Sequence, residues 1–356
     1  MTDLTTTKEA PEEQEPLRLG VIGAGWFASR RHLPDIQKNP QATLSALCRR
    51  DPEARATLVE HFKLPPGSAF ADWRQMLDQV ALDAVLIATP HALHYEQAKE
   101  ALERGLHVLL EKPMTLHGAE ARELVALAKA RGLKLAVALN PPHWAHCHQL
   151  RRALKNEAMG TLESAAMYWT GAANYLFGRS PRPADLPGVV PPTDYRADPE
   201  LNGGGYFIDG GPHLVSELLW VTGLRVRQVT CLMDTLPVDM RAVLSLRMEN
   251  GAIASITSIG DSQYPNRRVR NVFGATGGVA TVIGFDFETN INIQGQEHRK
   301  FREADLPPVA SPIANFVDAI QGRSALYSPG EHGAHVVEVV EAAYQSAGAG
   351  QTISLD

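Results

Sequence analysis

The segment from Gly23 to Ala28 reads GAGWFA and directly follows the apolar run LRLGVI. Its spacing matches the G-x-G-x-x-G/A pattern of dinucleotide-binding turns. Gly23 permits a tight turn, Gly25 lets the backbone approach a pyrophosphate, and the small side chain of Ala28 lets the following helix pack closely on a sheet. The segment therefore predicts a phosphate-binding turn between a strand and a helix. The alternative interpretation is a purely structural glycine turn.

The residues that follow this turn by about 20 positions bear on the choice of nicotinamide cofactor. Enzymes that use NAD commonly carry an acidic side chain there, which accepts hydrogen bonds from the ribose 2'-hydroxyl. This chain carries Arg49 and Arg50, followed by Asp51 and Pro52. A guanidinium suits a 2'-phosphate, so we expect NADP to be preferred, with NAD as the second possibility. Asp51 could reach the ribose, but its place before Pro52 favours capping of a helix.

Three later residues, Lys112, Asp209 and His213, carry side chains that can hold charge or exchange a proton. Taken singly, each has an ordinary structural interpretation: a solvated lysine after a strand, a helix cap after glycines, and a hydrogen-bonded histidine in a helix. Asp209 and His213 are four positions apart, which places both side chains on one face of a helix. Pro212 lies between them and lacks an N–H, so the shared face requires a helix that begins or bends there.

The elements that must position these residues follow two different patterns. Up to Asn140, apolar strand candidates alternate with helical stretches, which indicates a parallel, doubly wound sheet. The strands are expected at residues 17–22, 43–48, 84–89, 107–111 and 133–139. After Asn140, closely spaced strand candidates with turn residues between them predict a mainly antiparallel sheet. They lie at residues 162–170, 227–233, 242–249, 252–260 and 271–284, and helical patterns return at 313–322 and 335–347.

The 356 residues are too many for one ordinary core, so two domains are expected. The fold class is α/β: an N-terminal Rossmann dinucleotide-binding domain, followed by an α+β domain with an open, mainly antiparallel sheet. We expect a flexible arm at residues 1–16, the Rossmann domain at 17–140, and a substrate-binding and oligomerisation domain at 141–356. The C-terminal helices are expected to pack back on the first domain.

Composition argues against several classes of protein. Lys and Arg total 34 against 40 Asp and Glu, and the formal charge of -6 gives no general attraction to nucleic acid or anionic membranes. The cysteines, Cys48, Cys147 and Cys231, are odd in number and widely spaced, which argues against a disulfide framework or a four-thiolate metal site. Residues 1–16 contain no apolar stretch suited to a signal peptide or a membrane anchor. We therefore expect a cytoplasmic protein with neither nucleic acid nor membrane as a partner.

Several separated motifs together resemble one known family. GAGWFA, EKPMTL and GGGYFIDGGPH are similar in order and spacing to motifs of the glucose-fructose oxidoreductase, inositol dehydrogenase and rhizopine-catabolism (Gfo/Idh/MocA) family, as are ATPHALH, DPELNGGG and AAYQSAGAGQTISL. The likeness runs from about Leu17 to the C-terminus. It implies a pyridine nucleotide that acts on sugars, cyclitols or related polyols. It also implies an open sheet that joins subunits, so a homodimer or homotetramer is expected.

The resemblance assigns roles to individual residues. It implies that Lys112, which would form a cis bond to Pro113, reaches the reacting hydroxyl or carbonyl and stabilises negative charge there. His213 would exchange a proton with the substrate, and Asp209 would orient His213 or the substrate. These three residues would bind substrate together with Asn140 and Arg196, although a surface salt bridge is an equal alternative for Arg196. The implied cofactor contacts are Gly23, Gly25, Trp26, Phe27, Ala28, Arg49, Arg50, Thr89, Pro90, His94, Glu111 and Lys112.

Two departures from the family pattern are expected to shape the substrate pocket. His91 stands where many relatives carry a polar amide, and NPPHWAH replaces a segment that often contains arginine. The second segment begins a histidine-rich stretch with His143, His146 and His148. A single strand-to-helix junction does not supply a closed metal site without partners, so no metal is expected.

The sequence thus favours an NAD(P)-dependent dehydrogenase or reductase that transfers a hydride between nicotinamide and a secondary alcohol or ketone of a sugar-like substrate. A second possibility is a tightly bound nucleotide that is recycled within the site, in a sugar-sugar oxidoreductase or in redox-assisted elimination of a glycoside. A third is a non-enzymatic, nucleotide-sensing regulator built on the same fold. The presence of Lys112, Asp209 and His213 argues against the third.

Overall fold

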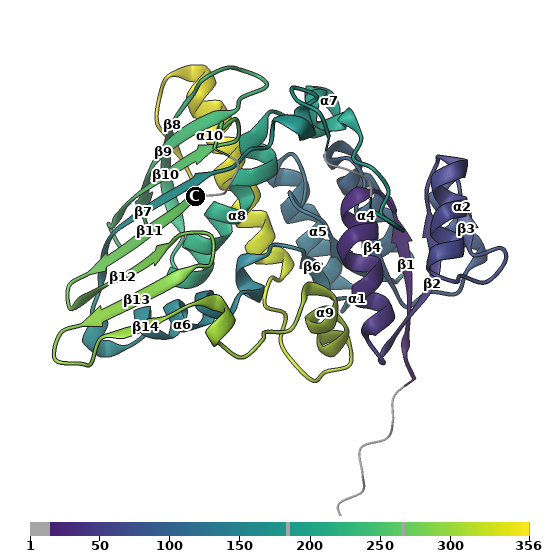
Figure 1. The fold of residues 1–356 in the computed structure, drawn as a ribbon, viewed down its shortest axis with the longest axis horizontal. Coiled ribbons are helices and arrows are strands. Elements are labelled where there is room, and N and C mark those ends of the chain that lie inside the picture. Colours follow the sequence, from purple (N-terminus) through teal and green to yellow (C-terminus); the bar gives the residue numbers. More distant parts are fainter. Residues whose placement is uncertain (1–14, 183–185, 265–267, 356) are drawn as a thin grey trace, which may run out of the picture.

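A computed structural model describes residues 15–182, 186–264 and 268–355. Residues 1–14, which make up most of the expected arm, lie outside the described residues. Two sheets stand at opposite sides of the molecule with helices between them (Figure 1). We call the sheet of the first half sheet A and that of the second half sheet B.

Sheet A is entirely parallel and has the strand order β3-β2-β1-β4-β5-β6. All residues of the central strand β4 are buried, as expected for a parallel sheet covered on both faces. The five expected strands are present, and the two-residue β3 was not anticipated from the sequence. The strands are β1 (Leu17–Ile22), β2 (Ala42–Cys48), β3 (Ala69–Phe70), β4 (Ala84–Ile87), β5 (His107–Leu110) and β6 (Leu135–Val137).

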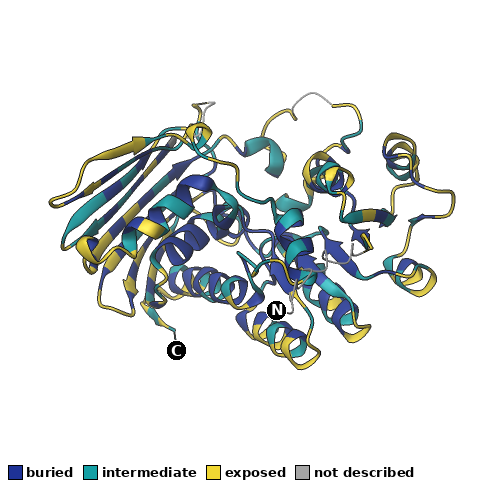
Figure 2. Cartoon of the chain, turned by 90° about the horizontal axis from the view of Figure 1, so that it is seen from below, coloured by how far each residue is buried: buried dark blue, intermediate teal, exposed yellow. Residues whose placement is uncertain are grey.

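Helices connect these strands and cover both faces of sheet A (Figure 2). The helix after the glycine turn runs through a π-helical stretch, η1, and ends at Lys38, as the sequence predicts. Asp51 caps α2 by accepting hydrogen bonds from the backbone N–H groups of Glu53 and Ala54, so the capping interpretation is confirmed. The helices are η1 (Ala28–His32), α1 (Leu33–Lys38), α2 (Pro52–His61), α3 (Trp73–Gln79), η2 (His91–Leu93), α4 (His94–Glu103) and α5 (Gly118–Ala130).

Sheet B has the order β14-β13-β12-β11-β7-β10-β9-β8-β15. All neighbours pair antiparallel except β7 and β10, which are parallel, so the expected mainly antiparallel sheet is confirmed. Burial alternates strictly along β9, which therefore has one covered and one open face. The strands are β7 (Leu162–Thr170), β8 (Val226–Met233), β9 (Arg241–Met248), β10 (Ile253–Ile259), β11 (Arg268–Ala275), β12 (Gly278–Ile283), β13 (Glu288–Ile293), β14 (Arg299–Phe301) and β15 (Ile353–Ser354).

The helices of the second half lie mostly between the two sheets. Helix α8 packs on β7, β9 and β10, and α10 contacts β8 of sheet B as well as α5 and β6 of the first half. Helix α9 contacts α1 and β5. These elements are η3 (Pro141–His143), α6 (Ala145–Leu154), η4 (Glu157–Met159), η5 (Asn174–Phe177), η6 (Asp194–Ala197), α7 (Pro199–Asn202), α8 (Tyr206–Thr222), η7 (Glu303–Asp305), α9 (Pro312–Ile320) and α10 (Gly330–Ala349).

One apolar core joins the inner face of sheet B, helices α8 and α10, and one face of sheet A. A second core covers the other face of sheet A. The shared core holds α8 opposite the carboxyl ends of the sheet A strands, which is where open α/β sheets bind ligands. Over the described part of the chain, no helix combines the length and apolar character needed to cross a membrane.

Candidate active site

A cavity of about 750 Å³ lies at the carboxyl ends of β1, β2 and β4. It is lined by eight of the residues expected to contact the cofactor: Gly23, Gly25, Trp26, Phe27, Arg49, Arg50, Thr89 and Pro90. Tyr195, Arg196 and the neighbouring residues 191–194 also line it, so a segment from the second half of the chain helps to enclose this cavity. Ala28 is buried under the turn, in keeping with its expected packing role.

The glycine turn has the geometry that its sequence requires. Gly23 adopts a φ of +84°, and a Cβ atom there would lie 2.6 Å from Cγ2 of Thr89 and 2.8 Å from the backbone of Ala88. A side chain is therefore excluded at Gly23. The N–H of Ser29 donates to the carbonyl of Gly25 over 2.9 Å. The backbone N–H groups that precede Ser29 in the first helical turn have no acceptor within the helix, so they are the groups available to bind a phosphate.

Arg49 lies beside this turn. A Cβ atom on Gly25 would be 3.5 Å from Nη1 of Arg49, which shows how closely the guanidinium approaches the glycines. Its Nε is buried and donates to no acceptor among the residues that the structure describes. Burial lowers the pKa of Arg49, because the cation has lost part of its water. A partly desolvated guanidinium with an unused donor fits an anionic ligand at this place.

A second cavity of about 400 Å³ adjoins the first and shares Trp26, Phe27, Thr89, Tyr195 and Arg196 with it. Four residues expected to be catalytic or to bind substrate line this second cavity, namely Lys112, Asn140, Asp209 and His213, together with Glu111, which was expected to contact the cofactor. Aromatic side chains that the sequence analysis did not single out form much of the remaining wall: Trp169, Tyr175, Tyr206 and Phe285. Aromatic side chains combined with convergent polar groups are typical of a small-molecule site.

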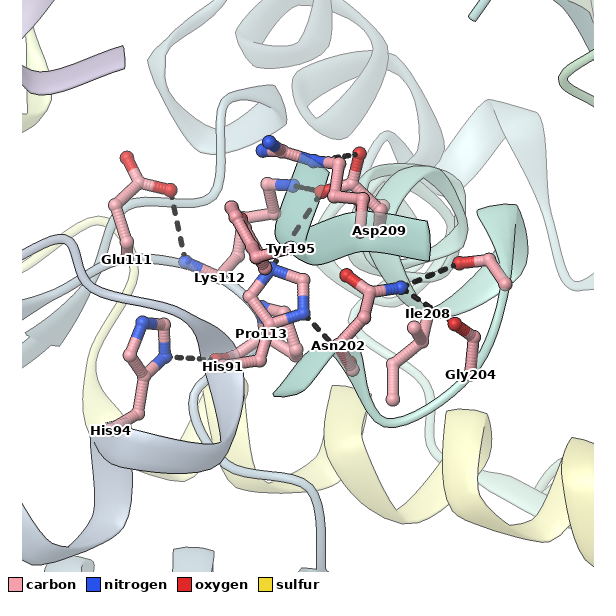
Figure 3. A network of polar contacts seen from close by, with 12 residues as sticks. His91, His94, Glu111, Lys112, Pro113, Tyr195, Asn202, Gly204, Ile208 and Asp209 are labelled. Carbon is pink, nitrogen blue, oxygen red and sulfur yellow. Dashed lines mark hydrogen bonds and ion pairs between the residues drawn. The ribbon is translucent and has the colours of Figure 1, made fainter. Parts of the chain in front are cut away.

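Asp209 is the centre of the polar groups in the second cavity (Figure 3). Its Oδ1 accepts a hydrogen bond from Nζ of Lys112 over 2.7 Å, and its Oδ2 lies 3.1 Å from Nε of Arg196. Lys112 also donates to the backbone carbonyl of Asp209 over 2.8 Å. The side chains of Lys112 and Arg196 are each only 11% exposed, so the surface salt bridge considered for Arg196 is wrong: the ion pair is buried.

The electrostatics of this cluster keep Asp209 ionised. Burial by itself would raise the pKa of Asp209, but the cations Arg196 and Lys112 hold it well below its usual range. Both carboxylate oxygens are engaged by these cations, so Asp209 positions Lys112 and Arg196 directly. Two cations around one carboxylate leave an excess of positive charge, which suits an oxygen that gains negative charge during reaction.

His91, at the position where relatives often carry an amide, is part of the same cluster. Burial lowers its pKa well below the usual value, so the imidazole is neutral. Its Nδ1 lies 2.9 Å from the carbonyl oxygen of Asn202 and therefore carries the proton. Nε2 is then an acceptor, and the hydroxyl of Tyr195 donates to it over 3.3 Å. The sequence suggested that His91 shapes the substrate pocket, and His91 lines the second cavity. Tyr195 was assigned no role from sequence, since its partners are distant in the chain.

Two further polar groups position the turn after β5. His32 and Glu111 form a buried pair, with 2.7 Å between Nε2 and Oε1. Burial would raise the pKa of Glu111, but His32 and the Lys112 charge leave it lowered, so Glu111 is a carboxylate. The Lys112–Pro113 peptide bond is cis, as expected.

His94 does not line either cavity, so its expected direct contact with the cofactor is not supported. The ring is fully buried, with Nδ1 at 2.8 Å from the carbonyl oxygen of Pro113 and Nε2 at 3.0 Å from that of Thr89. It therefore links the segments that follow β4 and β5. In this geometry His94 can contribute by positioning Thr89.

Helix α8 carries both Asp209 and His213 and runs uninterrupted through Pro212. The helix starts at Tyr206, so Pro212 lies inside the helix rather than at its start, and Asp209 and His213 nevertheless both line the second cavity. Its first turn is held by Asp239, whose carboxylate accepts hydrogen bonds from the N–H groups of Gly205 and Phe207 and from the hydroxyl of Tyr344. A residue from the loop before β9 thus caps the helix that presents the reaction centre.

The histidines of the 143–148 segment do not converge. His143 Nδ1 lies 2.9 Å from the carbonyl oxygen of Ala310, and His148 Nε2 lies 2.9 Å from that of Pro142. His146 instead contacts Glu303, with 2.6 Å between Nδ1 and Oε2. The three rings therefore do not form a common metal site.

Comparison with known proteins agrees with this architecture. Residues 17–139 match the family model described as "Oxidoreductase family, NAD-binding Rossmann fold", and residues 147–280 match the "GFO/IDH/MocA C-terminal domain". A curated relative, D-glucoside 3-dehydrogenase of Escherichia coli strain K12, is 26% identical over 96% of this chain and 98% of its own length. D-xylose 1-dehydrogenase (NADP(+)) 2 of Haloferax volcanii is 26% identical over 96% of this chain and its full length.

Among solved structures, the WlbA dehydrogenase from Bordetella pertussis in complex with NADH and UDP-GlcNAcA superposes with a TM-score of 0.81. It is 24% identical and the match covers 97% of this chain and 99% of that one, so the likeness extends to both domains of the fold. The family models and the curated relatives are consistent with the two adjoining cavities described above. The chain belongs to the Gfo/Idh/MocA family and is an oxidoreductase with an NAD-binding Rossmann fold.

Proposed function

We propose that this protein transfers a hydride between a nicotinamide nucleotide and a secondary alcohol or ketone of a sugar, a cyclitol or a related polyol. The observation that carries the proposal is the buried cluster of Lys112, Asp209 and Arg196 in a cavity that adjoins the cavity of the glycine turn. The aromatic wall of the second cavity suits the apolar faces of a sugar ring, and its charged groups suit the hydroxyls. Curated relatives include enzymes named for D-glucosides and D-xylose.

The residues of this chain have separate roles in the proposed reaction. A bound nicotinamide would supply or accept the hydride, and the protein supplies orientation and electrostatics. Lys112 stabilises negative charge on the substrate oxygen, and Asp209 holds Lys112 in place. His213 exchanges the proton of the reacting hydroxyl, because imidazole titrates near neutral pH. Arg196 and Asn140 bind other substrate oxygens from the walls of the same cavity.

We further propose that the cofactor is NADP rather than NAD. Support comes from Arg49, whose unused Nε donor lies beside the glycine turn, and from Arg50, which lines the same cavity with an exposed side chain. Asp51, the acidic residue nearest to these arginines, caps α2. Two guanidinium groups at this edge of the cavity favour a 2'-phosphate over a 2'-hydroxyl.

The test is a screen of aldoses, ketoses, cyclitols and simple glycosides with NADP and NAD, following the absorbance of the reduced nicotinamide. We expect turnover on at least one class of polyol or its keto form. The absorbance spectrum of the purified protein is recorded first, because a retained nucleotide would indicate recycling within the site. Absence of turnover with every substrate, together with tight nucleotide binding and no retained cofactor, would favour a nucleotide-sensing regulator.

We also propose the division of the chain near residue 140 and assembly through the open face of sheet B. The domain division is supported by the change from a parallel to a mainly antiparallel sheet after β6. Assembly is supported by apolar side chains on the uncovered face, among them Leu232, Val243 and Ile253, which are 76%, 47% and 50% exposed. A homodimer or a homotetramer would cover them.

A further inference from the structure

Away from both cavities, three potential metal ligands meet in the core beneath sheet B: His146, Cys147 and Glu217. Their side chains come from the first turn of α6 and from the middle of α8. The residues are 0%, 0% and 1% exposed. One imidazole nitrogen, the thiol sulfur and a carboxylate oxygen all lie within 4.8 Å of one another. No metal was expected from the sequence, because the histidine-rich stretch supplies no closed site by itself and Glu217 is distant from it in the chain.

The spacing of these donors is close to that around a tetrahedral zinc ion. Nε2 of His146 and Sγ of Cys147 are 3.4 Å apart. With Zn–N near 2.0–2.1 Å and Zn–S near 2.3 Å, a tetrahedral angle separates the two donors by about 3.6 Å. The imidazole and the thiol therefore need to move little to share one ion. The mixture of nitrogen, sulfur and oxygen donors favours zinc over magnesium or calcium, which prefer oxygen ligands.

The groups around the three donors orient them toward a common point. Nδ1 of His146 lies 2.6 Å from Oε2 of Glu303, so Nδ1 carries a proton and Nε2 is directed at Cys147. Glu303 is itself held by the backbone N–H groups of Ala145 and His146. A carboxylate that fixes the far nitrogen of a histidine in this way is a common feature of zinc sites.

Glu217 provides a further, independent observation that points to a bound cation. Its Oε1 accepts a hydrogen bond from Nδ2 of Asn271 over 2.8 Å. Its Oε2 is buried and, within the described residues, has no hydrogen-bond partner. An unsatisfied carboxylate oxygen in the core is costly, and a cation removes that cost. A zinc ion with one thiolate, one carboxylate and one neutral imidazole also has no net charge, which is the condition for burial in an apolar core.

We propose that His146, Cys147 and Glu217 bind a structural zinc ion that joins α6 to α8. The fourth position is completed by a water molecule or by the second oxygen of Glu217. None of the three ligands lines the second cavity; the ring of His146 stacks on Trp144, which contacts Trp169 of the cavity wall. The effect of the ion on the reaction is indirect: Glu217 follows His213 by one helical turn, so the ion anchors the helix that carries the reaction centre.

The test is the metal content of the full-length protein, produced in zinc-supplemented medium and dialysed against a chelator, by mass spectrometry of the metal. We expect about one zinc ion per chain, since a buried site releases its metal slowly. Cys147→Ala and Glu217→Gln should each reduce zinc to background. Cys231→Ala is the matched control, because Cys231 is also a buried free cysteine but lies on β8.

A second measurement keeps the proposal testable if a variant does not fold. Wild-type protein produced in cobalt-supplemented medium should show a thiolate-to-cobalt charge-transfer band and the strong visible bands of tetrahedral cobalt, and Cys231→Ala should keep them. A wild-type protein with background metal and no cobalt bands would overturn the proposal, since Cys147 would then only donate a hydrogen bond to His146. Zinc that persists undiminished in folded Cys147→Ala would overturn it as well.

Discussion

At the scale of single residues, His213 and Lys112 should give separable defects. His213→Asn keeps some hydrogen bonding but loses titration near neutral pH, so we expect turnover to fall by roughly 100-fold or more, as for other lost acid-base groups. Cofactor affinity should change little, because His213 lines only the second cavity. The measurement is steady-state kinetics over pH, with His117→Asn as the control because its side chain is 62% exposed.

Lys112→Ala should also lower turnover, but by removing positive charge at the substrate oxygen and one partner of Asp209. If His213→Asn kept near-normal turnover and an unchanged pH profile while Lys112→Ala abolished both, proton exchange would belong to Lys112. His213 would then be a substrate-binding residue only.

Arg49 should decide between the two nicotinamide nucleotides. A charge-assisted hydrogen bond contributes about 1.5–3 kcal/mol, so Arg49→Ala should weaken NADPH binding by roughly 10- to 150-fold. NADH, which lacks the 2'-phosphate, should bind almost as before. Fluorescence titration of both nucleotides measures this, and Arg50→Ala should give a smaller effect because Arg50 is exposed. Wild-type protein that bound NADH as tightly as NADPH would contradict the proposed preference.

At the scale of elements, the position of α8 depends on its cap. Asp239 is fully buried and accepts two backbone N–H groups at the start of that helix. Asp239→Ala should therefore lower the free energy of unfolding by about 1–2 kcal/mol at pH 7, a common effect of a lost cap, and should also lower turnover. Ser311→Ala removes the cap of α9 and serves as the control, because Ser311 lines neither cavity. Equal loss of turnover in both variants would argue against a specific role of α8 position.

Asp239 should also make the stability of the protein depend on pH. Burial raises the pKa of Asp239 from 3.8 to about 6, despite the opposing bonds from Tyr344 and Phe207. The folded protein then binds this proton more tightly than the unfolded chain, so the stabilisation that comes from protonating Asp239 is complete below pH 3.8 and is lost as pH rises through about 6. Asp239→Asn should flatten the dependence of the free energy of unfolding on pH between these two values, as measured by urea denaturation. An unchanged slope would show that Asp239 titrates as in the unfolded chain.

At the scale of the whole molecule, the open face of sheet B should control assembly. Leu232 and Val243 are cross-strand partners on β8 and β9, and both side chains are exposed. Two charges placed there oppose burial in an interface. The double variant Leu232→Glu, Val243→Glu should shift a dimer or tetramer to smaller species in light scattering, whereas Ala130→Glu on the exposed side of α5 should not. A wild-type monomer at micromolar concentration would contradict the proposed assembly.

The features that follow from the amino-acid sequence alone are local. The glycine turn, the Asp51 cap and most strands follow from spacing and apolar pattern within a few residues, and each is present where it was expected. The two-residue β3 was missed because so short a strand has no readable pattern. The residues of the reaction centre were found from separate motifs, and they line one cavity.

Which distant side chains come into contact depends on the tertiary structure. The bond from Lys112 to Asp209 joins residues 97 positions apart, and the contact from Tyr195 to His91 spans 104. Arg196 was equally consistent with a surface salt bridge, and its burial against Asp209 depends on how the segment 191–196 folds over the cavities. The family resemblance implied a cofactor contact for His94, whereas the structure buries its ring between the backbone carbonyls of Pro113 and Thr89. The contacts of Asp209, Arg196 and Tyr195 depend on how the two halves of the chain pack together, because local spacing does not determine which distant groups will meet.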